Sequence, residues 1–304
     1  GDDPAQLAAV QVLVKLNADV VLLTGLDYDL RGAALAALGQ RLADAGAPYP
    51  YQLALRPNTG VATGLDLDGN GVTGEPRDAM AFGLFAGQAG MAVLSRQQID
   101  TDHLRNFSGF LWSDLPGNLT LSDTPPTQLL STAGHYEVPL LLPDGRSLRL
   151  LAYYATPPVF DGPEDRNGRR NHDESAFWLH LLAGDLAYPA PQTPFVLLGQ
   201  SNLDPADGEG RADALRALLT HPALQDPAPR GAARRRDPGQ RGDAALDTAL
   251  YPKLGGLRVE QILPSADLRV TGAGVLWPPD TDPLAAILAT ASRHRPVWVD
   301  VTLP

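Results

Sequence analysis

Short apolar runs rich in β-branched residues recur along the whole chain, and proline and glycine residues separate them. The runs "ADVVLL" at 18–23, "FVLLG" at 195–199 and "PVWVDV" at 296–301 each have the length and composition of a buried strand. Apolar residues at helical spacing predict helices that begin at Pro4, Ala33, Glu174 and Arg211. Strands and helices mixed in this order predict an α/β sheet system with functional groups on the loops at the strand ends.

Charge and composition narrow the classes of function. The formal net charge of −11 over 304 residues makes charge-driven binding to nucleic acid or anionic lipid unfavourable. No apolar run is long enough to span a bilayer. Cysteine is absent, which excludes disulfides and thiolate metal sites. The chain starts at Gly1 without methionine, so one expectation is an exported protein, periplasmic or extracellular, that has lost an N-terminal segment.

Three motifs follow one another in the second half of the chain: "GQSN" at 199–202, "RVEQIL" at 258–263 and "SRH" at 292–294. They resemble the motifs G-D-x-N, R-x-D-Y-x-L and S-D-H of the endonuclease/exonuclease/phosphatase family, the DNase I-like metal-dependent phosphoesterases. The resemblance extends over nearly the whole chain. It implies a single domain over residues 1–304 with a four-layer αββα sandwich of two mixed β-sheets flanked by helices.

The resemblance also implies a divalent metal site, and most of its positions are substituted in this sequence. The family places a Glu after the first long strand, a His on the central hairpin, the Asp of G-D-x-N and the Asp of S-D-H at this site. In that order, the residues found here are Gly25, Tyr154, Gln200 and Arg293. Asn202, Glu260 and His294 remain as candidate catalytic residues, with the Glu260 carboxylate orienting the imidazole of His294.

Two interpretations of this degenerate site stay open. Mg²⁺ is normally held through one or two carboxylates and its waters, so the loss of two carboxylates makes Mg²⁺ binding in the cleft doubtful. This favours a pseudoenzyme that binds a small phosphorylated ligand or a protein partner. The alternative is an active metal-dependent phosphodiesterase or phosphatase with a rearranged ligand set.

The resemblance further implies a strand before the helix that begins at Pro4, and this strand is missing from the sequence. We expect that the segment has been removed or that another chain supplies it. An incomplete sheet has an open edge, which makes a partner at this edge, or a role as a structural subunit of a larger assembly, a third hypothesis.

Two loops are rich in arginine. In "DGPEDRNGRRNHDE" at 161–174, Arg169 and Arg170 are candidate phosphate-binding residues, and a structural role in this loop is the alternative. The loop 226–243 is interpreted either as a solvated segment or as a lid that attracts phosphate.

The loop 66–78, "DLDGNGVTGEPRD", begins like the calcium-binding loop of an EF-hand. Arg77 stands where a bidentate Glu belongs, so Glu75 or Asp78 would have to close the shell. The predicted calcium ligands are Asp66, Asp68, Asn70, the carbonyl of Val72 and Asp78. The alternative is a glycine-rich turn whose side chains bond their own backbone.

Overall fold

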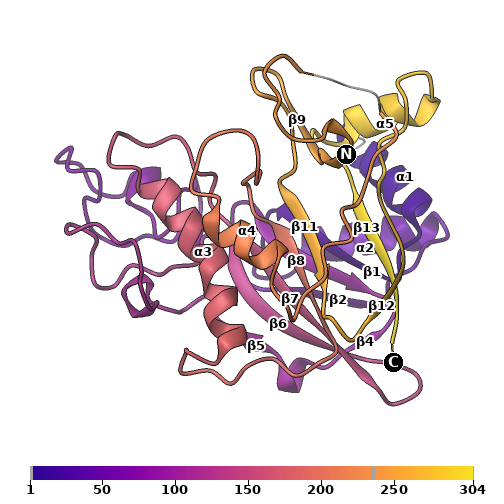
Figure 1. Cartoon of the computed structure of the whole chain (residues 1–304), viewed down its shortest axis with the longest axis horizontal. Helices are drawn as coiled ribbons and strands as arrows, with labels where there is room; N and C mark the ends of the chain where they lie inside the picture. Colours follow the sequence, from indigo (N-terminus) through magenta and orange to yellow (C-terminus); the bar gives the residue numbers. More distant parts are fainter. Residues whose placement is uncertain (1–2, 234–236, 304) are drawn as a thin grey trace.

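The structure is a computed structural model that describes residues 3–233 and 237–303. The larger of its β-sheets lies at the centre of the molecule (Figure 1). Its strands lie in the order β11-β8-β7-β6-β4, and β5 also pairs with β6. The bounds are β4 Gln98–Ile99, β5 Arg105–Asn106, β6 Gly134–Leu141, β7 Ser147–Tyr154, β8 Phe195–Gln200 and β11 Glu260–Pro264. The β7 and β8 pair is parallel and the other pairs are antiparallel, so this sheet is mixed as predicted.

The second β layer consists of two separate antiparallel pieces (Figure 1). One piece has the order β1-β3-β2, and the other is the pair β12-β13. The bounds are β1 Val20–Leu26, β2 Tyr51–Ala54, β3 Gly90–Ser95, β12 Arg269–Val275 and β13 Val297–Thr302. A short hairpin, β9 Ala249–Tyr251 with β10 Gly255–Leu257, precedes β11. The described residues therefore hold one mixed sheet and, opposite it, a layer in two parts.

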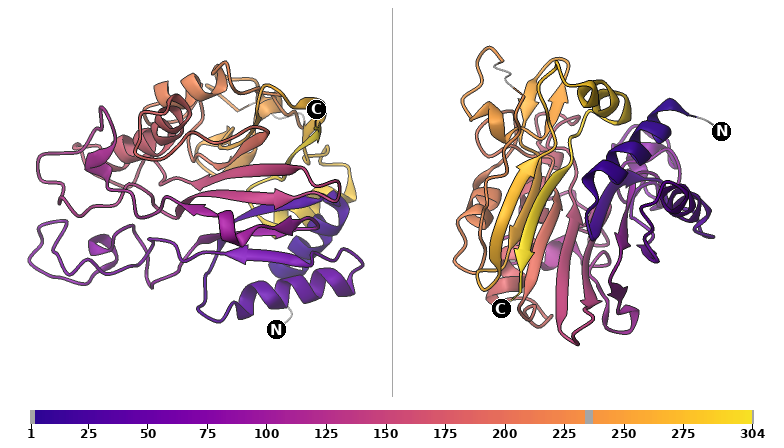
Figure 2. Two further views of the ribbon diagram at one scale, coloured as in Figure 1. Left: turned by 90° about the horizontal axis from the view of Figure 1, so that it is seen from below. Right: turned by 90° about the vertical axis from the view of Figure 1, so that its right-hand side faces the viewer.

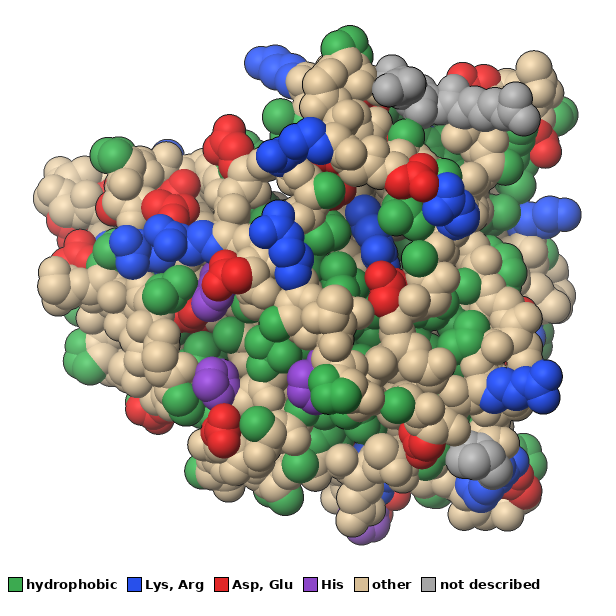
Figure 3. All heavy atoms as spheres, viewed as in Figure 1, with side chains coloured by type: hydrophobic (Ala, Val, Ile, Leu, Met, Phe, Trp, Pro, Cys, Tyr) green, Lys and Arg blue, Asp and Glu red, His purple; other side chains and the backbone are tan. Residues whose placement is uncertain are grey.

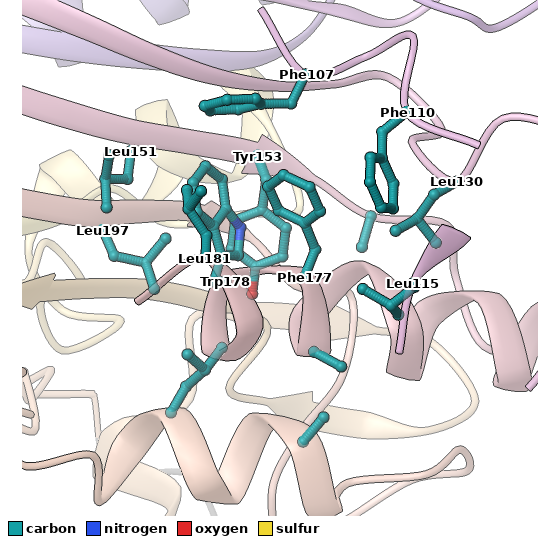
Figure 4. Packing of buried hydrophobic residues seen from close by; sticks show 14 of the residues in the cluster. Phe107, Phe110, Leu115, Leu130, Leu151, Tyr153, Phe177, Trp178, Leu181 and Leu197 are labelled. Carbon is teal, nitrogen blue, oxygen red and sulfur yellow. The ribbon is translucent and has the colours of Figure 1, made fainter. Parts of the chain in front are cut away.

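Helices cover both outer faces of these layers (Figure 2). Their bounds are α1 Pro4–Leu16, α2 Ala33–Asp44, α3 Arg166–Ala183, α4 Asp213–Leu219 and α5 Pro283–Ala291. Figure 4 shows Phe177, Trp178 and Leu181 of α3 packed on Leu151 and Leu197 of the larger sheet. Helices α1 and α2 pack on β1 and β3, and α1 also packs against α5. A third cluster, which includes Val93, Val138 and Leu150, fills the space between the β layers, so the four-layer sandwich is confirmed.

The structure differs from the sequence prediction at α3. The helix predicted to begin at Glu174 begins at Arg166, eight residues earlier. The first half of α3 buries polar side chains, among them Asn171 and Asp173, instead of an apolar stripe. Apolar periodicity is the main signal of a helix in a sequence, and this half of α3 does not have it.

Burial also differs between the three predicted core strands. In β8 every residue except Leu198 is buried, as predicted. In β1 only Val21 is buried, and in β13 the most buried residues are only half-buried. The prediction that β1 and β13 are buried strands is therefore wrong for most of their residues. Each of these strands has a hydrogen-bonded neighbour on one side only within the described residues.

Candidate functional site

The candidate site lies where β7 and β8 end and β11 begins. In the sheet register, Gln200 at the end of β8 stands between Tyr154 of β7 and Glu260 of β11. The three predicted motifs are therefore brought to the same edge of the sheet, and Tyr154 joins them from the hairpin. Open α/β sheets place their ligands at such strand ends.

A chain of hydrogen bonds occupies the centre of this site. The Thr24 hydroxyl of β1 donates to Gln200 Oε1 at 2.7 Å, and Gln200 Nε2 donates to Asn202 Oδ1 at 2.8 Å. The Asn202 amide in turn donates to the carbonyl oxygen of Ala155 at 2.7 Å. Gln200 is only 5% exposed, so its amide is held in one orientation by a donor on one side and an acceptor on the other.

Glu260 and His294 form the second part of the site. His294 Nδ1 lies 2.5 Å from Glu260 Oε1, which confirms the predicted contact between the carboxylate and the imidazole. The Tyr251 ring packs edge-on to the His294 ring, with the ring centres 6.0 Å apart. The Arg293 guanidinium lies 5.7 Å from the centre of the Tyr251 ring. His294 is held in place by the backbone as well, because residue 294 forms a β-bridge with Ala249.

Two tyrosines of the site are neutral at physiological pH. Burial raises the pKa of Tyr154, and the negative charge of Glu260 adds to this effect. Burial also raises the pKa of Tyr251 to about 12, again with a contribution from Glu260. Both phenols are therefore hydrogen-bond donors and acceptors and cannot serve as bases near neutral pH.

Gly25 leaves an open space next to this arrangement. It has a φ of +80°, and no heavy atom of a non-neighbouring residue lies within 4 Å of the point where a Cβ would stand. The strand is irregular here, with a register shift between Thr24 and Leu26. Gly25, where the resemblance implies a metal-binding carboxylate, thus has no side chain, and no neighbouring residue fills the space that a side chain would take.

Two residues of the site were not predicted from the sequence. Thr24 is adjacent to the Gly25 position, so the strand that carries it gave a partial signal. Tyr251 lies on the short hairpin strand β9, outside the three motifs, and no pattern indicated it. Its place beside His294 is decided by the tertiary structure.

The two candidate phosphate-binding arginines donate to backbone carbonyl groups. Arg170 is buried, and its guanidinium donates to the carbonyl oxygens of Leu129, Leu130 and Ser131. Arg169 is half-buried and donates to the carbonyl oxygen of Glu164 at 3.1 Å. These contacts favour the structural role of this segment over phosphate binding. Residues 234–236 of the second arginine-rich loop lie outside the described residues.

The predicted calcium loop places three carboxylates together. One oxygen each of Asp66, Asp68 and Asp78 lies within 4.8 Å of the other two, and this is the only such group of three or more acids or histidines among the described residues. The turn contacts are present as well: the Asp66 carboxylate accepts from Gly69 N and Gly71 N, each at 2.8 Å. The geometry is therefore compatible with both interpretations of the loop.

Two β layers lie between helices, and "GQSN" at the end of β8 lies next to the Glu260 and His294 pair. This arrangement defines a DNase I-like αββα protein. The chain belongs to the endonuclease/exonuclease/phosphatase family, whose sequence profile matches residues 1–294. Members of this family are phosphoesterases and nucleases. No curated protein sequence matches the chain significantly.

Solved structures of this fold superpose on nearly the whole chain. An endonuclease/exonuclease/phosphatase from Beutenbergia cavernae DSM 12333 has a TM-score of 0.57 at 16% identity and covers 99% of this chain and 66% of its own. A family protein from Leptotrichia buccalis C-1013-b has a TM-score of 0.55 at 14% identity, and the match covers 99% of this chain and 93% of that protein. The mannosyl-6-phosphatase Bt3783 of Bacteroides thetaiotaomicron VPI-5482 has a TM-score of 0.52 at 13% identity, with 100% and 91% covered. The chain thus spans just under two thirds of the first of these proteins.

The surface and the helices add two observations. In Figure 3, basic and acidic side chains are interspersed on the face that is drawn. None of the helices in the described part of the chain has the length and apolar character needed to cross a membrane.

Proposed function

We propose that this chain is a non-hydrolytic member of its family whose candidate site binds a small phosphorylated ligand. The observation that carries the proposal is the hydrogen-bond chain from Thr24 through Gln200 to Asn202. It stands at the place where the family resemblance implies a metal carboxylate. An amide that donates to one neighbour and accepts from another contributes no negative charge to a cation.

The residues that remain give little charge for a divalent metal. Glu260 is the one carboxylate of the cleft among the residues singled out above, and its Oε1 is engaged by His294 at 2.5 Å. Hard divalent cations are held by carboxylates, and Mg²⁺ requires near-ideal octahedral geometry around such ligands. These residues therefore do not fit a divalent metal.

The same residues are suited to an anionic ligand. Arg293 is exposed, and its guanidinium lies beside the Tyr251 ring next to His294. A guanidinium, an imidazole and the hydroxyls of Tyr154 and Tyr251 supply donors of the kind that bind phosphate oxygens. The name of one neighbour in fold, a mannosyl-6-phosphatase, makes a sugar phosphate a reasonable first probe.

The test measures binding and hydrolysis with the same protein. We expect mannose 6-phosphate to bind in isothermal titration, and Arg293→Met to weaken this binding about tenfold or more because a charge-assisted contact is lost. Arg269→Met, at an exposed arginine of β12, is the matched control and should bind like the parent. Equal affinities of all three proteins, or no binding by the parent, would contradict this ligand proposal.

The second candidate function is a phosphoesterase with a rearranged ligand set. The short contact between Glu260 and His294 favours it, because a carboxylate that orients an imidazole is a common arrangement for proton transfer. Our proposal predicts no Mg²⁺- or Mn²⁺-dependent cleavage of bis(p-nitrophenyl) phosphate. A robust rate that a chelator abolishes and that disappears in His294→Ala would establish the second candidate instead.

A separate proposal concerns the loop 66–78, away from the cleft. We propose that Asp66, Asp68 and Asp78 bind Ca²⁺ when the medium supplies it at about millimolar concentration, as weak extracellular sites do. The close approach of the three carboxylates supports this proposal.

A further inference from the structure

A buried threonine outside the three motifs bonds to the backbone beside both members of the Glu260 and His294 pair. Thr248 immediately precedes β9 and is 1% exposed. Its hydroxyl accepts from the backbone N–H of Val259 at 2.9 Å and from that of Glu260 at 3.2 Å. These partners lie 11 and 12 residues further along the chain, whereas a threonine hydroxyl commonly bonds backbone groups within a few residues of itself. The Thr248 hydroxyl therefore holds the start of β11 in place.

The main chain of Thr248 and β9 holds the other member of the pair. The carbonyl oxygen of Thr248 accepts from the backbone N–H of Arg295 at 2.6 Å. Two residues after Thr248, the N–H of Leu250 donates to the carbonyl oxygen of Arg293 at 3.0 Å. His294 lies between these two bonds in the sequence, so its backbone is fixed on both sides.

The contact between the two side chains depends on both sets of bonds. His294 Nδ1 lies 2.5 Å from Glu260 Oε1. A carboxylate oxygen accepts, so the proton of this contact stands on Nδ1, and Nε2 is the nitrogen left for a ligand. A hydrogen bond weakens when its distance or angle changes. Displacement of the start of β11 would therefore weaken the preference of the proton for Nδ1.

We propose that Thr248 is a positioning residue of the candidate site. Its hydroxyl sets the contact of Glu260 with His294, and this contact decides which imidazole nitrogen is offered to the ligand. Because Thr248 is buried, it acts through the backbone of its neighbours and not by contact with a ligand. The consequence for ligand affinity rests on the function proposed above, whereas the consequence for the imidazole does not.

The first measurement follows the imidazole without any ligand. Protein with ¹⁵N-labelled histidine reports the tautomer of each ring by NMR, and the spectrum of His294→Gln assigns the signals of His294. Thr248→Val removes the hydroxyl at nearly constant shape and leaves the N–H groups of Val259 and Glu260 without this acceptor. We expect the proton on Nδ1 in the parent, and a shift of the His294 signals towards the Nε2-protonated tautomer in Thr248→Val.

Two further variants separate positioning from a merely structural role. Thr248→Ser keeps the hydroxyl and should give the parent spectrum. Ser265→Ala is the matched control, because the buried Ser265 hydroxyl also accepts from a backbone N–H, that of Phe195 at 3.0 Å, just beyond the other end of β11. Ser265→Ala should lower the melting temperature, as Thr248→Val does, but leave the His294 signals unchanged.

Circular dichroism checks that each variant is folded. If Thr248→Val is unfolded, Thr248→Ala takes its place in both measurements, because its smaller side chain leaves room for water at the two N–H groups. The expected shift of the His294 signals is in the same direction.

The second measurement is the affinity for mannose 6-phosphate in isothermal titration. We expect Thr248→Val to bind about tenfold more weakly than the parent, and Thr248→Ser and Ser265→Ala to bind like the parent. A parent that does not bind would contradict the function proposed for the site, and the NMR spectra would still decide the role of Thr248.

Unchanged His294 signals in the folded variant without the hydroxyl would overturn the proposal. Equal changes in this variant and in Ser265→Ala, or a Thr248→Ser spectrum unlike that of the parent, would assign Thr248 a structural role only. Equal affinities of the parent and the variant without the hydroxyl, where the parent binds, would overturn the link between Thr248 and the ligand.

Discussion

Introducing carboxylates at Gly25 and Gln200 is the most direct test of the proposal that the candidate site binds a phosphorylated ligand and not a divalent metal. The change is the double variant Gly25→Glu with Gln200→Asp. Without metal we expect this variant to be less stable than the parent. Gln200→Asp removes the donor to Asn202 and places a charge at a position only 5% exposed, which costs about 1–3 kcal/mol.

At Gly25→Glu the loss of stability comes from strain in the backbone. Space is available for a side chain, but a φ of +80° costs a residue other than glycine about 1–2 kcal/mol. The free energy of unfolding of the double variant in chelator should therefore fall by about 2–5 kcal/mol. If the new carboxylates bind Mg²⁺, a concentration of 100 times the dissociation constant returns about 2.7 kcal/mol.

Urea unfolding followed by far-UV circular dichroism, with Mg²⁺ or with chelator, measures both quantities. The neutral double variant Gly25→Gln with Gln200→Asn has the same side-chain lengths and is the matched control. It should lose stability without responding to Mg²⁺. The same Mg²⁺ response in the charged variant, the neutral variant and the parent would refute the reasoning, because carboxylate loss would then not decide metal affinity.

Two further predictions concern stability. Calcium at about millimolar concentration should raise the melting temperature of the intact chain but not that of the double variant Asp66→Ala with Asp68→Ala. Identical melting temperatures of the intact chain in calcium and in chelator would mean that the loop 66–78 is a glycine-rich turn without a calcium site. Burial raises the pKa of the Glu174 carboxyl from 4.5 to about 7 in the folded chain. As pH rises, this carboxyl therefore ionises in the unfolded chain before it ionises in the folded chain. The stability that the carboxyl contributes to the fold thus falls between pH 4.5 and pH 7. Glu174→Gln should flatten this fall in urea unfolding, and an unchanged pH dependence would contradict the assignment.

Much of the fold could be predicted because its signals are local. The runs at 20–23, 195–199 and 296–301 are strands in the structure, since apolar β-branched runs of this length favour strands. The first half of α3 could not be predicted. Its buried side chains are polar, and they are satisfied by loops distant in sequence, as Arg170 is by three carbonyl groups at 129–131. No local pattern encodes such partners.

Only some members of the candidate site, and only one of its contacts, could be predicted from the sequence. The motif order placed Gln200, Asn202, Glu260 and His294 at one site, and the structure brings them to neighbouring strand ends. The bond from Thr24 to Gln200 and the position of Tyr251 beside His294 depend on how separate sheets and hairpins pack. Arg170 was a candidate site residue and is instead buried in the structure. A charged residue in a polar segment gives no local sign in the sequence that it is buried.

The sequence by itself determined most of the order of strands and helices and the family resemblance, because both depend on residue types at short spacing. Only the tertiary structure decided that β1 and β13 are mostly half-buried, each with one hydrogen-bonded neighbouring strand among the described residues. The physical reason is that an apolar run specifies a strand, whereas its burial depends on which strands pair with it and what covers its two faces.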